Sequence, residues 1–117
     1  ACPLFVPLVE NGRFHRGDIV IETVAREYLE PLKAAGVDTL VLGCTHYPFA
    51  SEAIRFVLGE RTCLLDGGDG TAQQTRRLLA QAELLSDGPG GVQIENSADD
   101  PAFNGRAQDL LKISHEF

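Results

Sequence analysis

The chain has 117 residues, of which 44% are hydrophobic and 23% are charged, and its formal net charge is −7. This length suits a single domain with a core of its own, and the composition is ordinary for a globular protein. The acidic balance and the lack of a basic cluster argue against nucleic acid or an anionic membrane surface as a partner. No run of the sequence is long and apolar enough to predict a membrane span.

Residues 3–9 (PLFVPLV) are apolar but contain two prolines, which predicts a short extended segment or an edge strand. Asp18 is a good N-cap, and apolar residues then recur every four positions, which predicts a helix that stops near Gly36. Residues 37–42 (VDTLVL) are predicted to form the first buried strand.

Pro48 fits the first turn of a second helix, which Gly59 ends. Residues 62–66 (TCLLD) are predicted to form the next strand, with Cys63 in the core. The turn GGDG (67–70) leads into a third helix. It lacks the third glycine of a dinucleotide fingerprint, so we interpret it as a tight strand-to-helix turn.

Residues 86–91 (SDGPGG) are the one linker-like stretch of the sequence. After it, residues 92–96 (VQIEN) are predicted to form a strand. Residues 99–101, two aspartates and a proline, open a last helix that runs to about Ile113.

The alternation of strands and helices predicts an α/β fold with a parallel sheet that is flanked by helices on both faces. Ligands of such sheets bind at the carboxyl ends of the strands. Cys44, Glu10 and Asp66 each follow a predicted extended segment, so we expect all three near that edge.

The three cysteines have irregular spacing and form no CxxC pair. An odd number without regular spacing is not typical of a disulfide framework, so the sequence indicates a reducing, cytoplasmic setting. The chain also contains no Met and starts with ACPLF. We therefore expect a domain or fragment of a longer polypeptide.

Cys44, Thr45 and His46 stand in a row between the first predicted strand and the second helix. A helix N-terminus stabilises a thiolate, and a nearby histidine adds to this effect when it is protonated or acts as an acid. Thr45 offers a hydroxyl and a backbone N–H to an anionic group. The run therefore predicts a reactive thiol beside an anion-binding position, although a small buried cysteine and a satisfied core histidine are common alternatives.

Several chemistries can be weighed for this run. A metal site needs three or four ligands, and Cys44 with His46 supplies two at an awkward spacing, so we expect no metal. A cysteine phosphatase needs an arginine, which residues 45–50 lack. A hydrolase with Cys44 as nucleophile and His46 as base stays open, although such a base usually lies distant in sequence. The remaining option is proton transfer, in which a thiolate removes a hydrogen from a carbon next to a carboxylate.

Three stretches together, ACPLFVPLVE, LVLGCTHYPF and LLDGGDGTA, resemble the glutamate racemases and, more broadly, the cofactor-independent amino-acid racemases. The resemblance runs through most of the chain. It implies an isomerase that interconverts L- and D-glutamate without a cofactor and supplies D-glutamate for peptidoglycan. Racemases or decarboxylases that act on aspartate, hydantoins or arylmalonates share the Cys-Thr region, and a non-catalytic carboxylate-binding module is another alternative.

The resemblance also implies roles for single residues. The family places two cysteines on opposite faces of the substrate, where one removes the Cα proton and the other delivers one. Cys44 matches the second of these cysteines, His46 the histidine that assists it, Thr45 a substrate-binding position and Glu10 an acidic residue at the edge of the site. The family's first half, with the other cysteine in an Asn-Thr motif, has no counterpart in this sequence.

Racemases of this family are similar to one another in having two α/β domains with the active site between them. We therefore expect residues 1–91 to form a catalytic α/β domain. Residues 92–117 are expected to form a returning strand and helix that pack on an N-terminal racemase domain, and a homodimer is possible. Because one base returns its proton to the face it came from, we expect this chain alone not to racemise glutamate.

Overall fold

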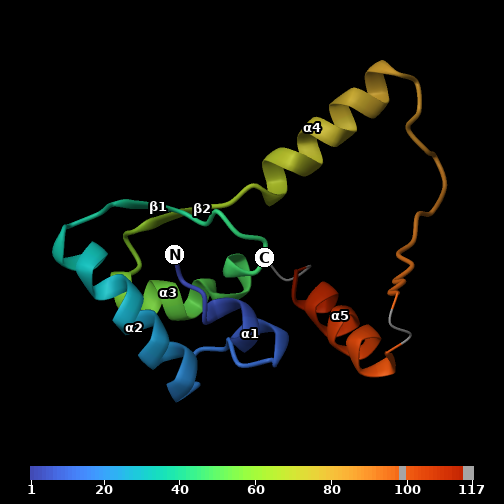
Figure 1. Cartoon of the computed structure of the whole chain (residues 1–117). Helices are drawn as coiled ribbons and strands as arrows, with labels where there is room; N and C mark the ends of the chain where they lie inside the picture. Colours follow the sequence, from blue (N-terminus) through green and yellow to red (C-terminus); the bar gives the residue numbers. More distant parts are fainter. Residues whose placement is uncertain (98–99, 115–117) are drawn as a thin grey trace.

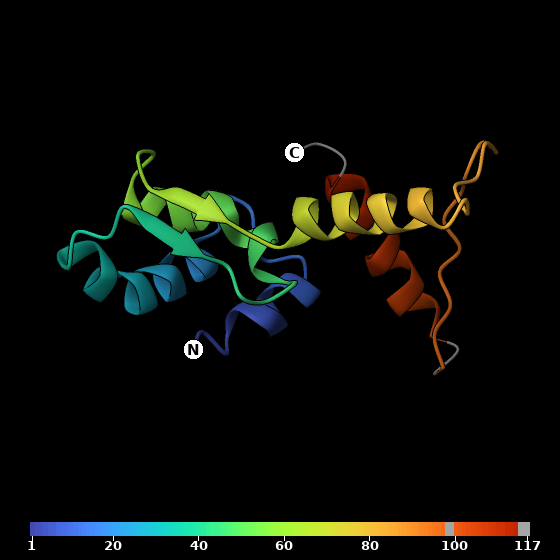
Figure 2. The same ribbon diagram turned by 90° about the horizontal axis from the view of Figure 1, so that it is seen from above.

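The structure is a computed structural model and describes residues 1–97 and 100–114. Its elements in chain order are α1 (Phe5–Glu10), α2 (Ile19–Ala34), β1 (Thr39–Val41), the 3-10 helix η1 (Tyr47–Ala50), α3 (Ser51–Leu58), β2 (Cys63–Leu65), α4 (Gly68–Gln81) and α5 (Pro101–Ser114). The two strands lie over α2 and α3, with α1 beside them, whereas α4 projects away from this body and α5 lies apart from the sheet (Figures 1 and 2). None of the described helices is long and apolar enough to cross a membrane.

The first element is a helix, so the prediction of an extended segment or edge strand over residues 3–9 is wrong. Pro7 is the third residue of α1, in the first turn, where backbone N–H groups have no partner within the helix. Phe5 and Val9 lie one turn apart and are each 1% exposed. The burial of Phe5 and Val9 on one face therefore favours a helix here, and Pro7 is compatible with the helix at this position.

The helix predicted from Asp18 is confirmed as α2. An Asp18 side-chain oxygen accepts a hydrogen bond of 2.9 Å from the N–H of Val20, as expected of an N-cap. Gly36 follows the helix with a φ of 70°, a conformation that glycine adopts without a steric penalty. Three residues at a spacing of four form the buried face of this helix: Ile21, Ala25 and Leu29.

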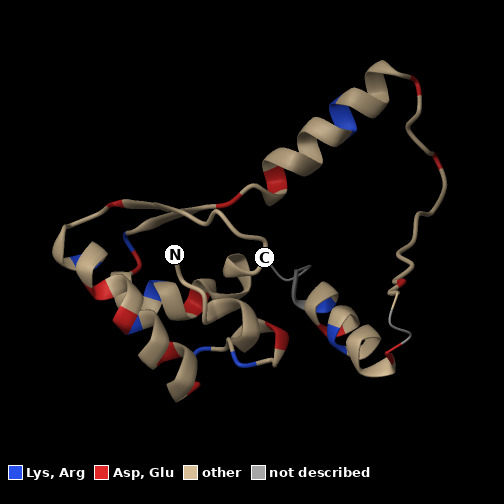
Figure 3. Ribbon diagram, viewed as in Figure 1, with Lys and Arg blue, Asp and Glu red and all other residues tan. Residues whose placement is uncertain are grey.

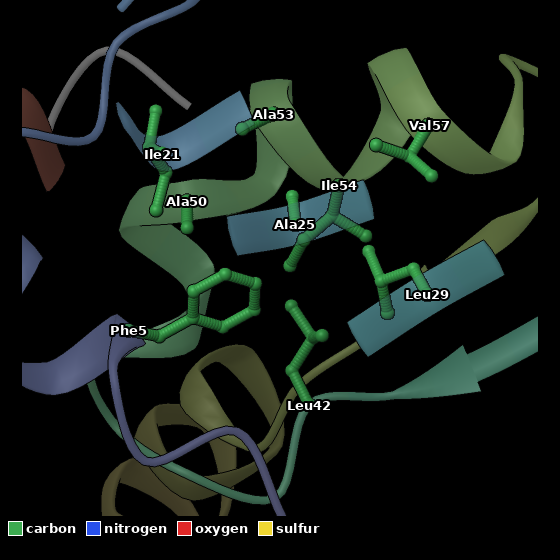
Figure 4. Packing of buried hydrophobic residues seen from close by; sticks show 9 residues of the cluster. All are labelled: Phe5, Ile21, Ala25, Leu29, Leu42, Ala50, Ala53, Ile54 and Val57. Carbon is green, nitrogen blue, oxygen red and sulfur yellow. The ribbon is translucent and has the colours of Figure 1, made fainter. Parts of the chain in front are cut away.

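The core lies between α1, α2, η1 and α3 and is closed by the residue that follows β1. Figure 4 shows side chains from all of these elements pointing toward one another. The cluster consists of Phe5, Ile21, Ala25, Leu29, Leu42, Ala50, Ala53, Ile54 and Val57. The second predicted helix is thus confirmed as η1 and α3, and Gly59 ends it with a φ of 99°.

The predicted parallel pairing is confirmed, because β1 and β2 form a two-stranded parallel sheet. Its inner residues Leu40 and Leu64 contact the core, but Val41 is 69% and Leu65 is 49% exposed on the other face. Cys63 shares this outer face and is exposed, so its predicted place in the core is wrong. The expected cover on both faces is also wrong, since α2 and α3 lie on one side only.

The third predicted helix is confirmed as α4, and the GGDG turn leads into it. This helix does not cover the sheet, although helices were expected to flank both sheet faces, and no residue of α4 is buried. Leu78 is 52% and Leu79 is 37% exposed. In both ribbon views this helix extends away from the body formed by the two strands and α1–α3 (Figures 1 and 2).

Residues 92–96 have no regular secondary structure, so the predicted strand is wrong. A strand needs a neighbour to pair with, and the described strands lie elsewhere. The segment is instead tied to α5, since the side-chain amide of Asn96 donates to that of Asn104 at 2.7 Å. Asp100 accepts from the N–H of Ala102 at the start of α5, whereas Asp99 lies outside the described residues. The division between residues 91 and 92 stays a prediction.

Candidate functional site

The Cys-Thr-His run lies where the sequence predicted, after the carboxyl end of β1, with Leu42 and Gly43 between the strand and Cys44. The N–H of Leu42 donates to the carbonyl of Leu65 at 2.7 Å and carries the ladder one residue past the strand. The chain then turns, and the N–H of Tyr47 donates to the carbonyl of Cys44 at 3.2 Å. The buried Leu42 on one side and η1 on the other therefore fix the run at the carboxyl edge of the sheet.

Glu10 and His46 meet at this edge, although 36 positions separate them in the sequence. Glu10 is the last residue of α1, and its Oε1 lies 3.3 Å from Nε2 of His46. The two side chains are 57% and 32% exposed, respectively. Oγ1 of Thr45 lies 3.4 Å from Nδ1 of the same ring. The structure thus brings together three of the four site residues that the resemblance implied.

This arrangement assigns the hydrogens of the histidine ring. An ionised carboxylate only accepts hydrogen bonds, so Nε2 of His46 carries a hydrogen and donates it to Glu10. In the neutral ring Nδ1 then accepts from the hydroxyl of Thr45. With this assignment the three side chains form a carboxylate–imidazole–hydroxyl series, with a contact on each side of the ring.

Cys44, the fourth site residue, is half-buried, so its sulfur lies neither deep in the core nor fully in solvent. Over residues 1–97 and 100–114 its thiol has no hydrogen bond to His46, whose two ring nitrogens face Glu10 and Thr45. Assistance of Cys44 by His46 therefore stays a prediction.

All three thiols of the chain are free, and their surroundings differ. Burial raises the pKa of the Cys2 thiol, and the positive charge of the N-terminus opposes this with a smaller effect. Cys63 is exposed on the outer face of the sheet. Neither residue lies in the Cys-Thr-His run, so Cys44 is the one thiol positioned at the carboxyl end of β1.

A hollow of about 400 Å³ lies beside the run, between the start of α3 and the turn that follows β2. Thr45 and Asp66 both line it, so the predicted placement of Asp66 near this edge is confirmed. The Asp66 carboxylate accepts from the N–H of Gly68 at 2.7 Å and so fixes the start of α4. Arg55 and Asp69 line the same hollow. Neither residue was predicted from the sequence, because each is one of several charged residues on a helix.

A second hollow, of about 190 Å³, separates the end of α1 from α5. Glu10 and Gly12 line it on one side, and Arg106 and Asp109 line it on the other. The last described helix therefore lies close to the acidic member of the site. Nowhere in the described part of the chain do three or more His, Cys, Asp or Glu residues group as metal ligands would.

The chain is similar to several known proteins. The glutamate racemase of Herpetosiphon aurantiacus is 44% identical over 114 residues, which cover 97% of this chain and 44% of that protein. The glutamate racemase of Corynebacterium glutamicum is 47% identical over 87 residues, which cover 74% of this chain and 31% of that protein. No family model matches the chain.

Solved structures give the same result. The crystal structure of glutamate racemase from Thermus thermophilus in complex with β-chloro-D-alanine matches with a TM-score of 0.74 and 41% identity, over 92% of this chain and 42% of that one. Glutamate racemase from Francisella tularensis in complex with D-glutamate matches with a TM-score of 0.74 and 27% identity, over 95% of this chain and 41% of that one. The chain therefore spans less than half the length of each of these relatives.

Proposed function

This chain belongs to the glutamate racemase family and matches the C-terminal portion of its members, and from this premise we propose its function. We propose that it supplies one of the two catalytic cysteines of a glutamate racemase, the one that acts on a single face of the substrate. The observation that carries the proposal is the meeting of Glu10, His46 and Thr45 beside a half-buried Cys44 at the carboxyl edge of a parallel sheet. The same membership supports a cofactor-independent reaction, a cytoplasmic location and the supply of D-glutamate for peptidoglycan.

In this proposal the Cys44 thiolate acts on one face of the substrate Cα. When it removes the proton, the Cα–H bond breaks, an S–H bond forms, and the electron pair delocalises into the neighbouring carboxylate as a planar carbanion. Return of a proton from a thiol on the opposite face inverts the centre. The hydroxyl and N–H of Thr45 bind an anionic group of the substrate. Glu10 keeps the ring of His46 oriented beside Thr45.

The partner in this proposal is the N-terminal domain of a racemase, which would bring the second cysteine. The open face of α4 supports such a partner, because none of its residues, Leu78 and Leu79 included, is buried in the described part of the chain. Figure 3 shows that this helix carries few charges; in sequence they are Asp69, Arg76 and Arg77. We include residues 92–97 and α5 in the same contact surface, and a homodimer is the second candidate arrangement.

The test compares the isolated chain with a reconstituted pair. The chain alone, incubated with L- or D-glutamate, is expected to leave the circular dichroism of the substrate unchanged. Addition of the N-terminal portion of the Thermus thermophilus enzyme is expected to start racemisation, because the two catalytic faces are then complete. Cys44→Ser is expected to abolish the regained activity, and Cys63→Ser, which alters an exposed thiol on the outer face of the sheet, is the matched control.

Two results would contradict the proposal. Steady loss of optical activity with the isolated chain would show that no second catalytic face is needed. Equal loss of the regained activity in the Cys63→Ser and Cys44→Ser variants would show that the Cys-Thr-His run is not the catalytic one.

A further inference from the structure

We infer that Tyr47 is a positioning residue, which sets Glu10 at hydrogen-bonding distance from His46. The importance of this positioning for catalysis rests on the proposed function. The positioning itself is inferred only from contacts within the fold. The inference starts from the element that carries Glu10. Helix α1 has six residues, and so short a helix is not stable by itself in water. Contacts with the rest of the fold must therefore fix its place.

Phe5 is the main anchor of α1, since its side chain is 1% exposed. Its ring is held between two tyrosines in edge-to-face contacts. The Tyr47 ring centroid lies 5.5 Å away at an interplanar angle of 85°, and that of Tyr28 lies 5.5 Å away at 87°. Such geometry is the favoured one for aromatic pairs.

Both tyrosine hydroxyls also hold the backbone just before α1. The hydroxyl of Tyr47 donates to the carbonyl of Cys2 at 3.2 Å and accepts from the N–H of the same residue at 3.3 Å. The hydroxyl of Tyr28 accepts from the N–H of Leu4 at 3.3 Å. The segment that leads into α1 is therefore attached on both sides through a ring contact and a hydroxyl.

The two attachments differ in what they connect. Tyr47 directly follows His46 and is the first residue of η1, so it links the helix that carries Glu10 to the run that carries His46. Tyr28 lies on α2, which contains none of the site residues. A shift of α1 against η1 would lengthen the 3.3 Å contact between Glu10 and His46. A few tenths of an ångström are enough, since a contact of about 3.6 Å is no longer a hydrogen bond. Tyr47 is thus the residue on which this contact depends, and Tyr28 is its natural control.

The test is NMR of the chain with ¹⁵N-labelled histidine, without substrate or partner. Glu10→Gln is expected to shift the Nε2 resonance of His46, because it replaces the ionised acceptor. Tyr47→Phe is expected to shift the same resonance most of the way toward the Glu10→Gln value, whereas Tyr28→Phe leaves it at the wild-type position. Each tyrosine variant removes a single oxygen and keeps a ring packed on Phe5, and far-UV circular dichroism verifies that both are folded.

Three outcomes would overturn the inference: an unchanged His46 resonance in Tyr47→Phe, an equal shift in Tyr28→Phe, or no effect of Glu10→Gln. A general loosening of the fold would move the resonance in both tyrosine variants, so the comparison separates positioning from stability. Because the spectra need neither turnover nor a second domain, a failure of the proposed function would leave this result standing, and the reverse also holds.

Discussion

Asp18 is the residue whose protonation the fold alters most clearly. Its carboxylate accepts from Nε of Arg13, from Nη2 of Arg13 at 2.8 Å and from the N–H of Val20 at 2.9 Å. The Arg13 hydrogen bonds, followed by that from Val20, lower the pKa of Asp18 to about 2. In the unfolded chain the pKa is roughly 3.9. The folded value is the lower one, so the ionised carboxylate stabilises the fold above the unfolded pKa and loses this effect as the pH falls toward about 2.

Asp18→Asn tests this effect with little change in shape. Asparagine remains a good N-cap for α2 but has no charge to lose. We expect the urea midpoint of the wild type to fall more steeply than that of the variant as the pH is lowered from about 4 to about 2. Parallel curves for the two proteins would show that the Asp18 carboxylate does not couple folding to pH.

The helices of this chain differ sharply in how much they bury. Ile54 of α3 is 1% exposed, whereas Leu78 of α4 is 52% exposed. Ile54→Ala is expected to lower the free energy of unfolding by about 2–5 kcal/mol, because it removes buried methyl groups and leaves a cavity. Leu78→Ala, the matched control, is expected to change it by about 0.5 kcal/mol or less. Urea denaturation measures both, and equal losses would contradict the packing described for α4.

The elements that the sequence predicted correctly are those whose signals are local. Asp18 and Gly59 mark the ends of α2 and α3, and apolar residues between such ends recur at helical spacing. Helix α1 was mispredicted because two prolines suggested an extended segment, while the burial of Phe5 depends on residues far along the chain. The sheet was predicted to be covered on both faces, and residues 92–96 were predicted to form a strand. Both predictions fail for a related reason: the apolar sequence patterns of strands assume covering helices and pairing strands, which the described chain does not provide here.

The site could be predicted in part. The position of the Cys-Thr-His run followed from strand and helix boundaries. Glu10 was expected near the same edge, both from the predicted segment before it and from the resemblance, but its contact with His46 was not predicted. No local pattern relates residues that are 36 positions apart. The attachment of α1 by Tyr47 had no sequence signal either. A tyrosine before a proline is as compatible with a surface turn as with a side chain that anchors a helix.

The whole molecule is more extended than its length requires. Its radius of gyration is 16.8 Å and its extents are 49 × 35 × 22 Å, whereas a compact chain of this size has a radius of roughly 13 Å. The difference comes from α4 and the irregular segment after it, which hold α5 away from the sheet (Figure 1). Large apolar side chains on α4 and in the segment after it are exposed: Leu78, Leu79, Leu84, Leu85 and Val92.

Hydrogen exchange tests whether that surface is an interface. Amides of α4 are expected to exchange fast in the isolated chain, because no side chain of this helix is buried. They are expected to become protected when the N-terminal portion of the Thermus thermophilus enzyme is added, while α2 stays protected in both states. Strong protection of the α4 amides in the isolated chain would contradict the assignment of α4 to an interface. So would a lack of protection when the added N-terminal portion has restored activity.

The two-stranded sheet has a further consequence for the behaviour of the chain in solution. Among the described residues, β1 and β2 pair only with each other, so each leaves one row of backbone donors and acceptors unpaired. Such rows, next to the outward-facing Val41 and Leu65, favour the addition of strands from other polypeptides. We therefore expect strand addition at β1, the strand that leads to Cys44, to limit the solubility of the isolated protein.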